Sequence, residues 1–127
     1  MELFILAVFV LLLTIVLIIF KKRDHKISKN ELENSIKKLN QLKHHETQLT
    51  LIKAHKIFIS SIKLCPKDKD LTAAQITAKY QERFPNQKKI WRLHKLRNQV
   101  AHEVDFKLNT NSEEIINTYK KALKGLS

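Results

Sequence analysis

The sequence predicts an all-α protein, in which one apolar helix near the N-terminus precedes a small bundle of four or five helices. Residues 3–20 contain one polar side chain, Thr14, and no charge, Gly or Pro. The rest of the chain holds a single Gly and two Pro, which disfavours a turn-rich β architecture and favours helices joined by short loops. The length leaves room for one small core, and such a domain is marginal as a monomer.

The apolar segment is long enough to cross a lipid bilayer. A helix over residues 3–20 would span roughly 27 Å, close to the roughly 30 Å of a hydrocarbon core. All 24 Lys and Arg follow Phe20, beginning with the basic stop Lys21-Lys22-Arg23, so the positive-inside rule predicts an external N-terminus and a cytoplasmic C-terminal part. A cleaved signal peptide is the alternative, but the start Met1-Glu2 is not basic and no small-residue cleavage site follows. We therefore expect a single-pass protein of the inner cell membrane.

Charge and cysteine content indicate the surroundings and the partners. One cysteine, Cys65, cannot cross-link a small exported domain and suits a reducing compartment. The net charge of +12 favours an anionic neighbour, RNA or lipid head groups. The histidines and Cys65 show no Cys-x-x-Cys or His-x-x-x-His spacing, and no glycine-rich phosphate loop is present, so we expect neither a metal site nor a cofactor.

Three segments follow from these patterns: the anchor with its basic stop (1–23), a juxtamembrane first helical segment (24–47), and the main bundle (48–127). Ser28 to Glu31 reads as a capping box that opens a helix. Apolar residues then recur at helical spacing in two series. The first is Leu32, Ile36, Leu39 and Leu42, and the second is Leu49, Leu51, Ile52, Ala54, Ile57, Phe58 and Ile62. The stripe lapses near residues 44–47, which predicts a break there, although one continuous helix over 29–63 is the alternative.

The second half of the sequence predicts three further helices. Residues 65–70 form a loop, and Thr72 with Gln75 caps a helix from about 73 to 84 that ends at Pro85. The next helix runs from about 87 to 103, with Ile90, Leu93, Leu96, Arg97 and Val100 on its broad inner side. Thr110 or Asn111 caps the last helix, which carries Ile115, Ile116, Tyr119 and Leu123 and stops at Gly125.

The candidate site lies on the helix that spans residues 87–103. Arg97, Asn98 and His102 place a guanidinium, an amide and an imidazole within two helical turns. Arginine holds a phosphate through a fork of N–H donors, and histidine moves protons near neutral pH. Together these residue types suit phosphodiester chemistry. Trp91, on the stripe that continues through His94, Asn98 and His102, is interpreted as a core or interface anchor.

This string resembles the Arg-Asn-x-x-x-His signature of HEPN domains, small all-helical modules that include metal-independent endoribonucleases. The wider arrangement, from Trp91 through LHKLRNQVAHE to a final short helix, is similar to membrane-anchored HEPN-like proteins of unknown role. The resemblance implies a HEPN-like bundle, RNA as the substrate, and a homodimer whose two copies contribute Arg97 and His102 to one cleft. In that chemistry His102 would transfer protons and Arg97 would neutralise charge on the phosphate. Asn98 would orient either the phosphate or the imidazole of His102.

Helix geometry limits how Arg97 and His102 can meet. On an ideal helix they lie about 140° apart, so they converge only if the helix loosens near Ala101 or if two copies cooperate. The structural alternative makes Asn98 and His102 a hydrogen-bonded pair and places Arg97 in a salt bridge to Glu103, Asp105 or another helix.

The functional alternatives are a non-catalytic HEPN-like module that binds RNA or a protein partner, and an anchored scaffold without a nucleic-acid role.

Overall fold

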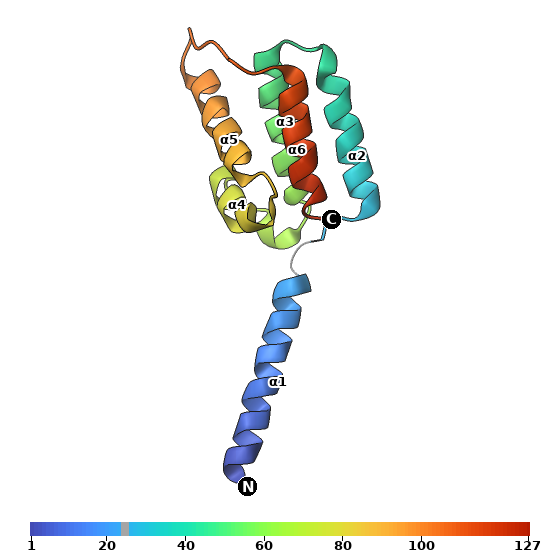
Figure 1. Ribbon diagram of the computed structural model, residues 1–127, viewed down its shortest axis with the longest axis vertical. Coiled ribbons are helices and arrows are strands. Elements are labelled where there is room, and N and C mark those ends of the chain that lie inside the picture. The colour runs from blue at the N-terminus through green and yellow to red at the C-terminus, as the bar shows by residue number, and fades with distance from the viewer. Residues whose placement is uncertain (24–25) are drawn as a thin grey trace.

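The computed structural model describes residues 1–23 and 26–127, together with the side chains of 1–19 and 26–127. All the regular secondary structure of these residues is helical. One helix, α1 (Glu2–Arg23), extends away from a compact bundle formed by the rest of the chain, as Figure 1 shows. The predicted basic stop at 21–23 forms the last turn of α1, and its side chains lie outside the described residues.

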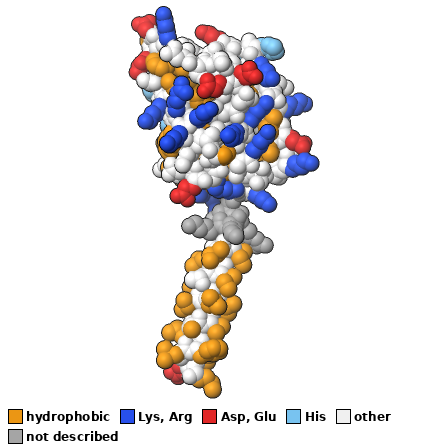
Figure 2. Space-filling view, viewed as in Figure 1, with side chains coloured by type: hydrophobic (Ala, Val, Ile, Leu, Met, Phe, Trp, Pro, Cys, Tyr) orange, Lys and Arg blue, Asp and Glu red, His pale blue; other side chains and the backbone are white. Residues whose placement is uncertain are grey.

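Between Leu3 and Ile19 the surface of α1 is apolar on every side. The window Glu2–Ile19 has a mean hydropathy of 3.1, and none of it is buried against the bundle. Its one hydroxyl, on Thr14, donates within the helix to the carbonyls of Val10 and Leu11 at 3.1 and 2.8 Å, so it leaves no unsatisfied donor. This helix is therefore long and apolar enough to span a membrane, and Figure 2 shows its orange surface beside the charged surface of the bundle.

The predicted break after the first bundle helix is confirmed. Helix α2 (Lys29–Asn40) is followed by a 3₁₀ turn (Gln41–His44), and α3 (Thr47–Ile62) begins three residues later, so the continuous-helix alternative is wrong. The turn is held because Thr50 donates its hydroxyl to the carbonyls of Leu42 and His45, each at 3.3 Å. The capping box of Ser28 and Glu31 at the start of α2 is also confirmed.

The remaining helices follow the sequence closely. After a 3₁₀ turn (Pro66–Asp68), α4 (Ala73–Tyr80) is capped by Thr72 and Gln75 as predicted, but it ends one turn early and continues as a 3₁₀ turn (Gln81–Arg83). Helix α5 (Gln87–His102) carries the candidate site. Helix α6 (Ser112–Lys124) takes its N-cap from Asn111 and its C-cap from Gly125.

The core lies where α3 packs against α6, with α2 and α5 on either side and α4 at one end, an arrangement that Figure 1 shows. All five helices of the bundle contribute to it, through buried side chains that include Leu39, Leu51, Phe58, Ile62, Ile76, Ile90, Leu93, Ile115, Ile116, Tyr119 and Leu123. Two members of the predicted second apolar series, Leu49 and Ile52, are instead exposed at 40% and 38%, because they lie on the outer side of α3. Residues 27–126 thus share one core.

The end of the bundle next to the anchor is closed by contacts between distant segments. Ile27 is buried, and its N–H donates to the carbonyl of Leu126 at 3.0 Å. Asp68, in the segment predicted to be a plain loop, is fully buried, forms an ion pair with Lys79 at 2.6 Å and accepts a hydrogen bond from Tyr80. Because only residues 24–26 separate α1 from Ile27, the covalent chain keeps this end of the bundle close to the end of the anchor.

Candidate functional site

Helix α5 presents its site residues on opposite sides. Ile90 and Leu93 are buried, which fixes the inner face of the helix, and the α-helical conformation continues without interruption to His102. The loosening near Ala101 that would bring Arg97 and His102 together is absent. At about 100° per residue, the two side chains leave the helix about 140° apart. Within one copy of the chain, Arg97 therefore faces the bundle and His102 faces solvent.

Arg97 is a partly buried cation with no acidic neighbour in the part of the chain that the structure describes. Its Nη1 donates to Asn98 Oδ1 at 3.2 Å, and its Nε is buried without a hydrogen-bond partner. Among the described residues, no Asp or Glu lies in ion-pair range of Arg97, so the expected salt bridge to Glu103, Asp105 or another helix is not formed. A guanidinium held in place without a counter-charge is suited to an anionic ligand.

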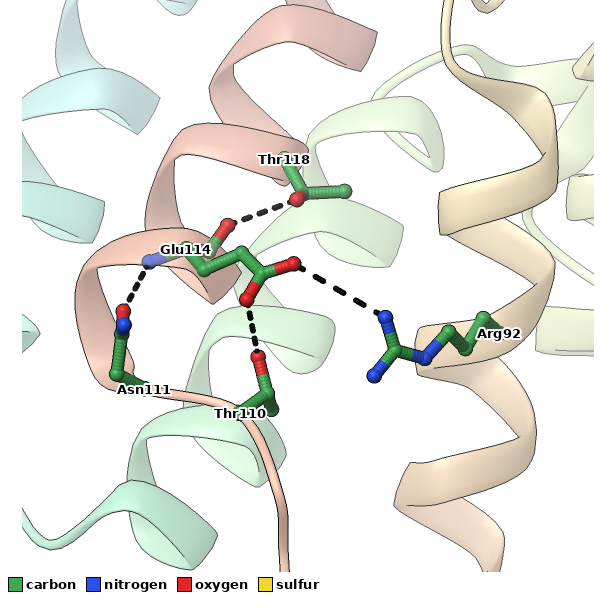
Figure 3. Close-up of polar contacts among 5 residues, drawn as sticks. All are labelled: Arg92, Thr110, Asn111, Glu114 and Thr118. Carbon is green, nitrogen blue, oxygen red and sulfur yellow. Dashed lines mark hydrogen bonds and ion pairs between the residues drawn. The ribbon is translucent and has the colours of Figure 1, made fainter.

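A second arginine on the same helix shows the contrast. Arg92 lies 4.0 Å from Glu114 Oε1, and Figure 3 shows how Glu114 is fixed at the start of α6. Thr110 donates its hydroxyl to Glu114 Oε2 at 2.8 Å, and the Glu114 N–H donates to Asn111 Oδ1 at 2.8 Å. This network ties the loop before α6 to α5. Arg92 therefore has a structural partner, whereas Arg97 has none among the acidic side chains described.

A chain of hydrogen bonds runs inward from Arg97 through two histidines. Asn98 Nδ2 lies 3.4 Å from His94 Nε2, and His94 Nδ1 lies 3.4 Å from His55 Nε2 on α3. Because guanidinium only donates, the amide oxygen of Asn98 must face Arg97 and its NH₂ must donate to His94. Neutral His94 then carries its proton on Nδ1 and donates to His55. Every donor in the chain thus points away from Arg97.

The electrostatics of this cluster keep both imidazoles neutral. Burial, followed by the charges of His94 and Arg97, lowers the pKa of His55 to about 4. Burial and then the charge of Arg97 also lower the pKa of His94. Burial raises the pKa of Tyr119, against the opposing effect of Arg97, and its buried hydroxyl has no hydrogen-bond partner. Arg97 is therefore the permanent positive charge of a cluster formed by α3, α5 and α6.

His102 is exposed at the C-terminal end of α5 and does not join the cluster. The predicted pair of Asn98 and His102 is not formed, because the Asn98 amide is directed one turn the other way, to His94. In the predicted stripe, His94 contacts both Trp91 and Asn98. The rings of Trp91 and His94 meet edge to face with centroids 5.7 Å apart, and the Asn98 amide lies in hydrogen-bond range of His94. The structure therefore brings Arg97 and Asn98 together and leaves His102 apart from them.

Sequence reasoning missed two members of the cluster. His55 and Tyr119 come from α3 and α6, and nothing in their own segments marks them as polar partners of Arg97. Tyr119 lies inside the last helix, as the sequence predicts, and His55 lies between Ala54 and Phe58, both buried. The available signal was the position of a histidine on the buried face of an otherwise apolar helix.

Among the described residues, no group of three or more His, Cys, Asp or Glu side chains could hold a metal ion. Comparison of the chain with protein-family models, curated protein sequences and solved structures found no match.

Proposed function

We propose that the chain is a membrane-anchored HEPN-like endoribonuclease, in which two copies contribute Arg97 and His102 to a shared RNA-cleaving site. The observation that carries the proposal is the half-buried guanidinium of Arg97, which has no acidic partner among the described residues. Such a group suits a phosphodiester, whose negative charge would complete its coordination.

Helix α1 would determine where in the cell the bundle acts. Helix α1 would cross the inner membrane through residues 3–20, with the N-terminus outside and the bundle in the cytoplasm, where RNA is available. The short connection to Ile27 would hold the bundle at the membrane surface. Its excess of Lys and Arg over Asp and Glu, visible in Figure 2, would favour an RNA strand near that surface.

The proposed cleavage needs only groups that the chain supplies and solvent water. His102 of one copy takes the proton of a 2′-hydroxyl, whose oxygen attacks the adjacent phosphorus. Arg97 of the other copy stabilises the extra charge on the pentavalent phosphate. The bond to the 5′-oxygen breaks, and that oxygen takes a proton from a solvent water, while the His102 imidazolium returns its proton to solvent. The products carry a 2′,3′-cyclic phosphate and a 5′-hydroxyl.

Pairing of two copies is essential to this proposal, because straight α5 directs Arg97 and His102 of one copy about 140° apart. The same observation favours the second candidate function. A bundle in which the two residues never meet would be a non-catalytic HEPN-like module that binds RNA or a protein partner at the membrane. Arg97 would then contribute to binding alone.

Cleavage by the purified full-length chain, in uncharged detergent and with a chelator present, tests the proposal. We expect wild-type protein to produce 2′,3′-cyclic phosphate ends. Arg97→Ala and His102→Ala should each lower the rate about 100-fold or more while the melting temperature changes little. Arg97→Lys should also fail, because a point charge does not reproduce the bidentate fork.

His44→Ala is the matched control, since His44 is exposed in the turn after α2 and lies outside the cluster. It should cleave like the wild type. A stable wild-type chain that binds RNA but leaves it intact would contradict the ribonuclease and favour the non-catalytic module. Loss of activity in the His44→Ala variant would show that the assay does not report on α5.

A further inference from the structure

The outer face of α5 carries a groove of about 430 Å³, separate from the buried histidine cluster. It is lined by Lys88, Trp91, Arg92, Lys95, Leu96 and Gln99. Lys88, Lys95 and Gln99 are exposed, and the Arg92 side chain is 56% exposed. None of the lining residues is acidic, and the carboxylate recorded beside them is Glu114, 4.0 Å from Arg92 at the rim. The groove is thus positively charged and contains one aromatic ring.

This groove leads towards His102. At about 100° per residue, His102 leaves α5 within about 40° of Lys88, Trp91 and Lys95, so the four side chains follow one line along the helix. Arg97 lies well outside that line, on the inner side. A ligand that lies along the groove would therefore reach the exposed imidazole at the end of α5 without crossing the helix.

The indole of Trp91 is held in a fixed orientation. Its Nε1 donates to Gln81 Oε1 at 3.0 Å, and its ring meets His94 edge to face. The residue is only half-buried, which leaves part of the ring open to the groove. A rigid, partly exposed aromatic ring between flexible cations is the arrangement on which proteins stack unpaired bases.

We propose that this groove binds single-stranded RNA, with a base stacked on Trp91 and phosphates paired with Lys88 and Lys95. The inference deepens the proposed function and rests on it for the role of the strand, which the groove delivers to His102. Paired RNA fits the site poorly, because the bases of a duplex are not free to stack on a protein ring. The absence of acidic lining residues matches the polyanionic backbone.

The single tryptophan of the chain makes the test direct, since all intrinsic indole fluorescence comes from Trp91. Full-length protein in uncharged detergent is titrated with a short 2′-O-methyl oligouridylate, which cannot form the cyclic phosphate. Binding is followed by Trp91 fluorescence and by the anisotropy of a labelled strand. We expect quenching of Trp91 that saturates together with the anisotropy.

Variants distinguish RNA binding in the groove from general attraction of RNA to the positive charge of the protein. Lys88→Gln with Lys95→Gln should lower the affinity about tenfold and reduce the slope of log K against log salt by about 1.4, the value for two contacts on a single strand. Lys53→Gln with Lys69→Gln removes the same charge from exposed residues on α3 and the following loop, and should change affinity less than twofold. Trp91→Leu should weaken binding about tenfold, and Trp91→Phe should restore most of it.

Three outcomes would overturn the inference. The first is unchanged Trp91 fluorescence at saturating RNA. The second is an equal loss of affinity in both lysine pairs, which would show diffuse attraction. The third is quenching by vesicles that contain anionic lipid but not by RNA, which would assign the groove to the membrane. Because the probe strand cannot be cleaved, these outcomes are independent of the cleavage assay that tests the proposed function.

Discussion

Lowering the pH from 6.5 towards 4 should destabilise the bundle through His55. The pKa of His55 is about 4 in the folded protein, against 6.5 for an unperturbed histidine. Above pH 6.5 the imidazole is neutral in both states, so stability does not depend on it. Between pH 6.5 and 4 the unfolded chain binds the proton and the folded chain does not, so stability falls as the pH falls. Below pH 4 this contribution levels off.

The size of the effect follows from the same two pKa values. One unit of pKa difference corresponds to about 1.4 kcal/mol, so the full loss is about 3 kcal/mol, of which about 2 kcal/mol is lost by pH 5. Protonation of His94 would also break a hydrogen bond. A charged His94 carries an N–H on Nε2, which would then face the NH₂ of Asn98 that donates to it. For a bundle of this size, about 2 kcal/mol lowers the melting temperature by about 10 °C.

Thermal unfolding of the full-length chain in uncharged detergent, followed by circular dichroism between pH 7.5 and 5, measures this loss. His55→Gln removes the titrating group and should remove more than half of the pH dependence, although the variant is less stable at pH 7.5. His44→Gln, on an exposed histidine, should retain the wild-type pH dependence. An equal loss of stability in His55→Gln and in the wild type would refute the assignment to the buried cluster.

Three further predictions test packing and topology. Gly125→Ala should destabilise the bundle by about 1–3 kcal/mol in urea unfolding, because the new Cβ would lie 2.6 Å from the Arg83 carbonyl oxygen; normal stability would contradict this close approach. Phe58→Ala should cost about 3–5 kcal/mol since the ring is fully buried, whereas Leu64→Ala, at 59% exposure, should change stability by less than about 0.5 kcal/mol; similar costs would refute the core assignment. A reporter fused after Ser127 should be active in the cytoplasm, and a processed periplasmic product would overturn the proposed topology.

Local signals predicted the helices well because the relevant physics is local. The two capping boxes and the lapse of the apolar stripe near residues 44–47 each act within a few residues, and they are readable from the sequence. The predicted end of α4 is wrong by one turn, because nothing in Gln81–Arg83 distinguishes a 3₁₀ turn from a last α-helical turn.

Features that depend on packing between distant segments could not be predicted in this way. Asp68 follows a lysine in a polar loop, and Lys79 and Tyr80 of α4 supply partners that make its burial favourable. The hydrogen-bonded pair Ser35 and Ser61, 2.7 Å apart and buried, joins α2 to α3 without any pattern in either helix. The direction of Arg97 was readable from helical spacing, but its neighbour His55 was not, because that contact is set by how α3 lies against α5.

The shared site is tested most directly by mixing two inactive variants. Arg97→Ala and His102→Ala chains are purified separately, combined under conditions that exchange subunits, and assayed for cleavage. In a symmetric dimer each mixed pair holds one intact site, so random exchange should restore about a quarter of the wild-type activity. Activity of either variant alone should stay at background. No recovery in the mixture, from wild-type protein that is active and dimeric, would contradict a site built from two copies of the chain.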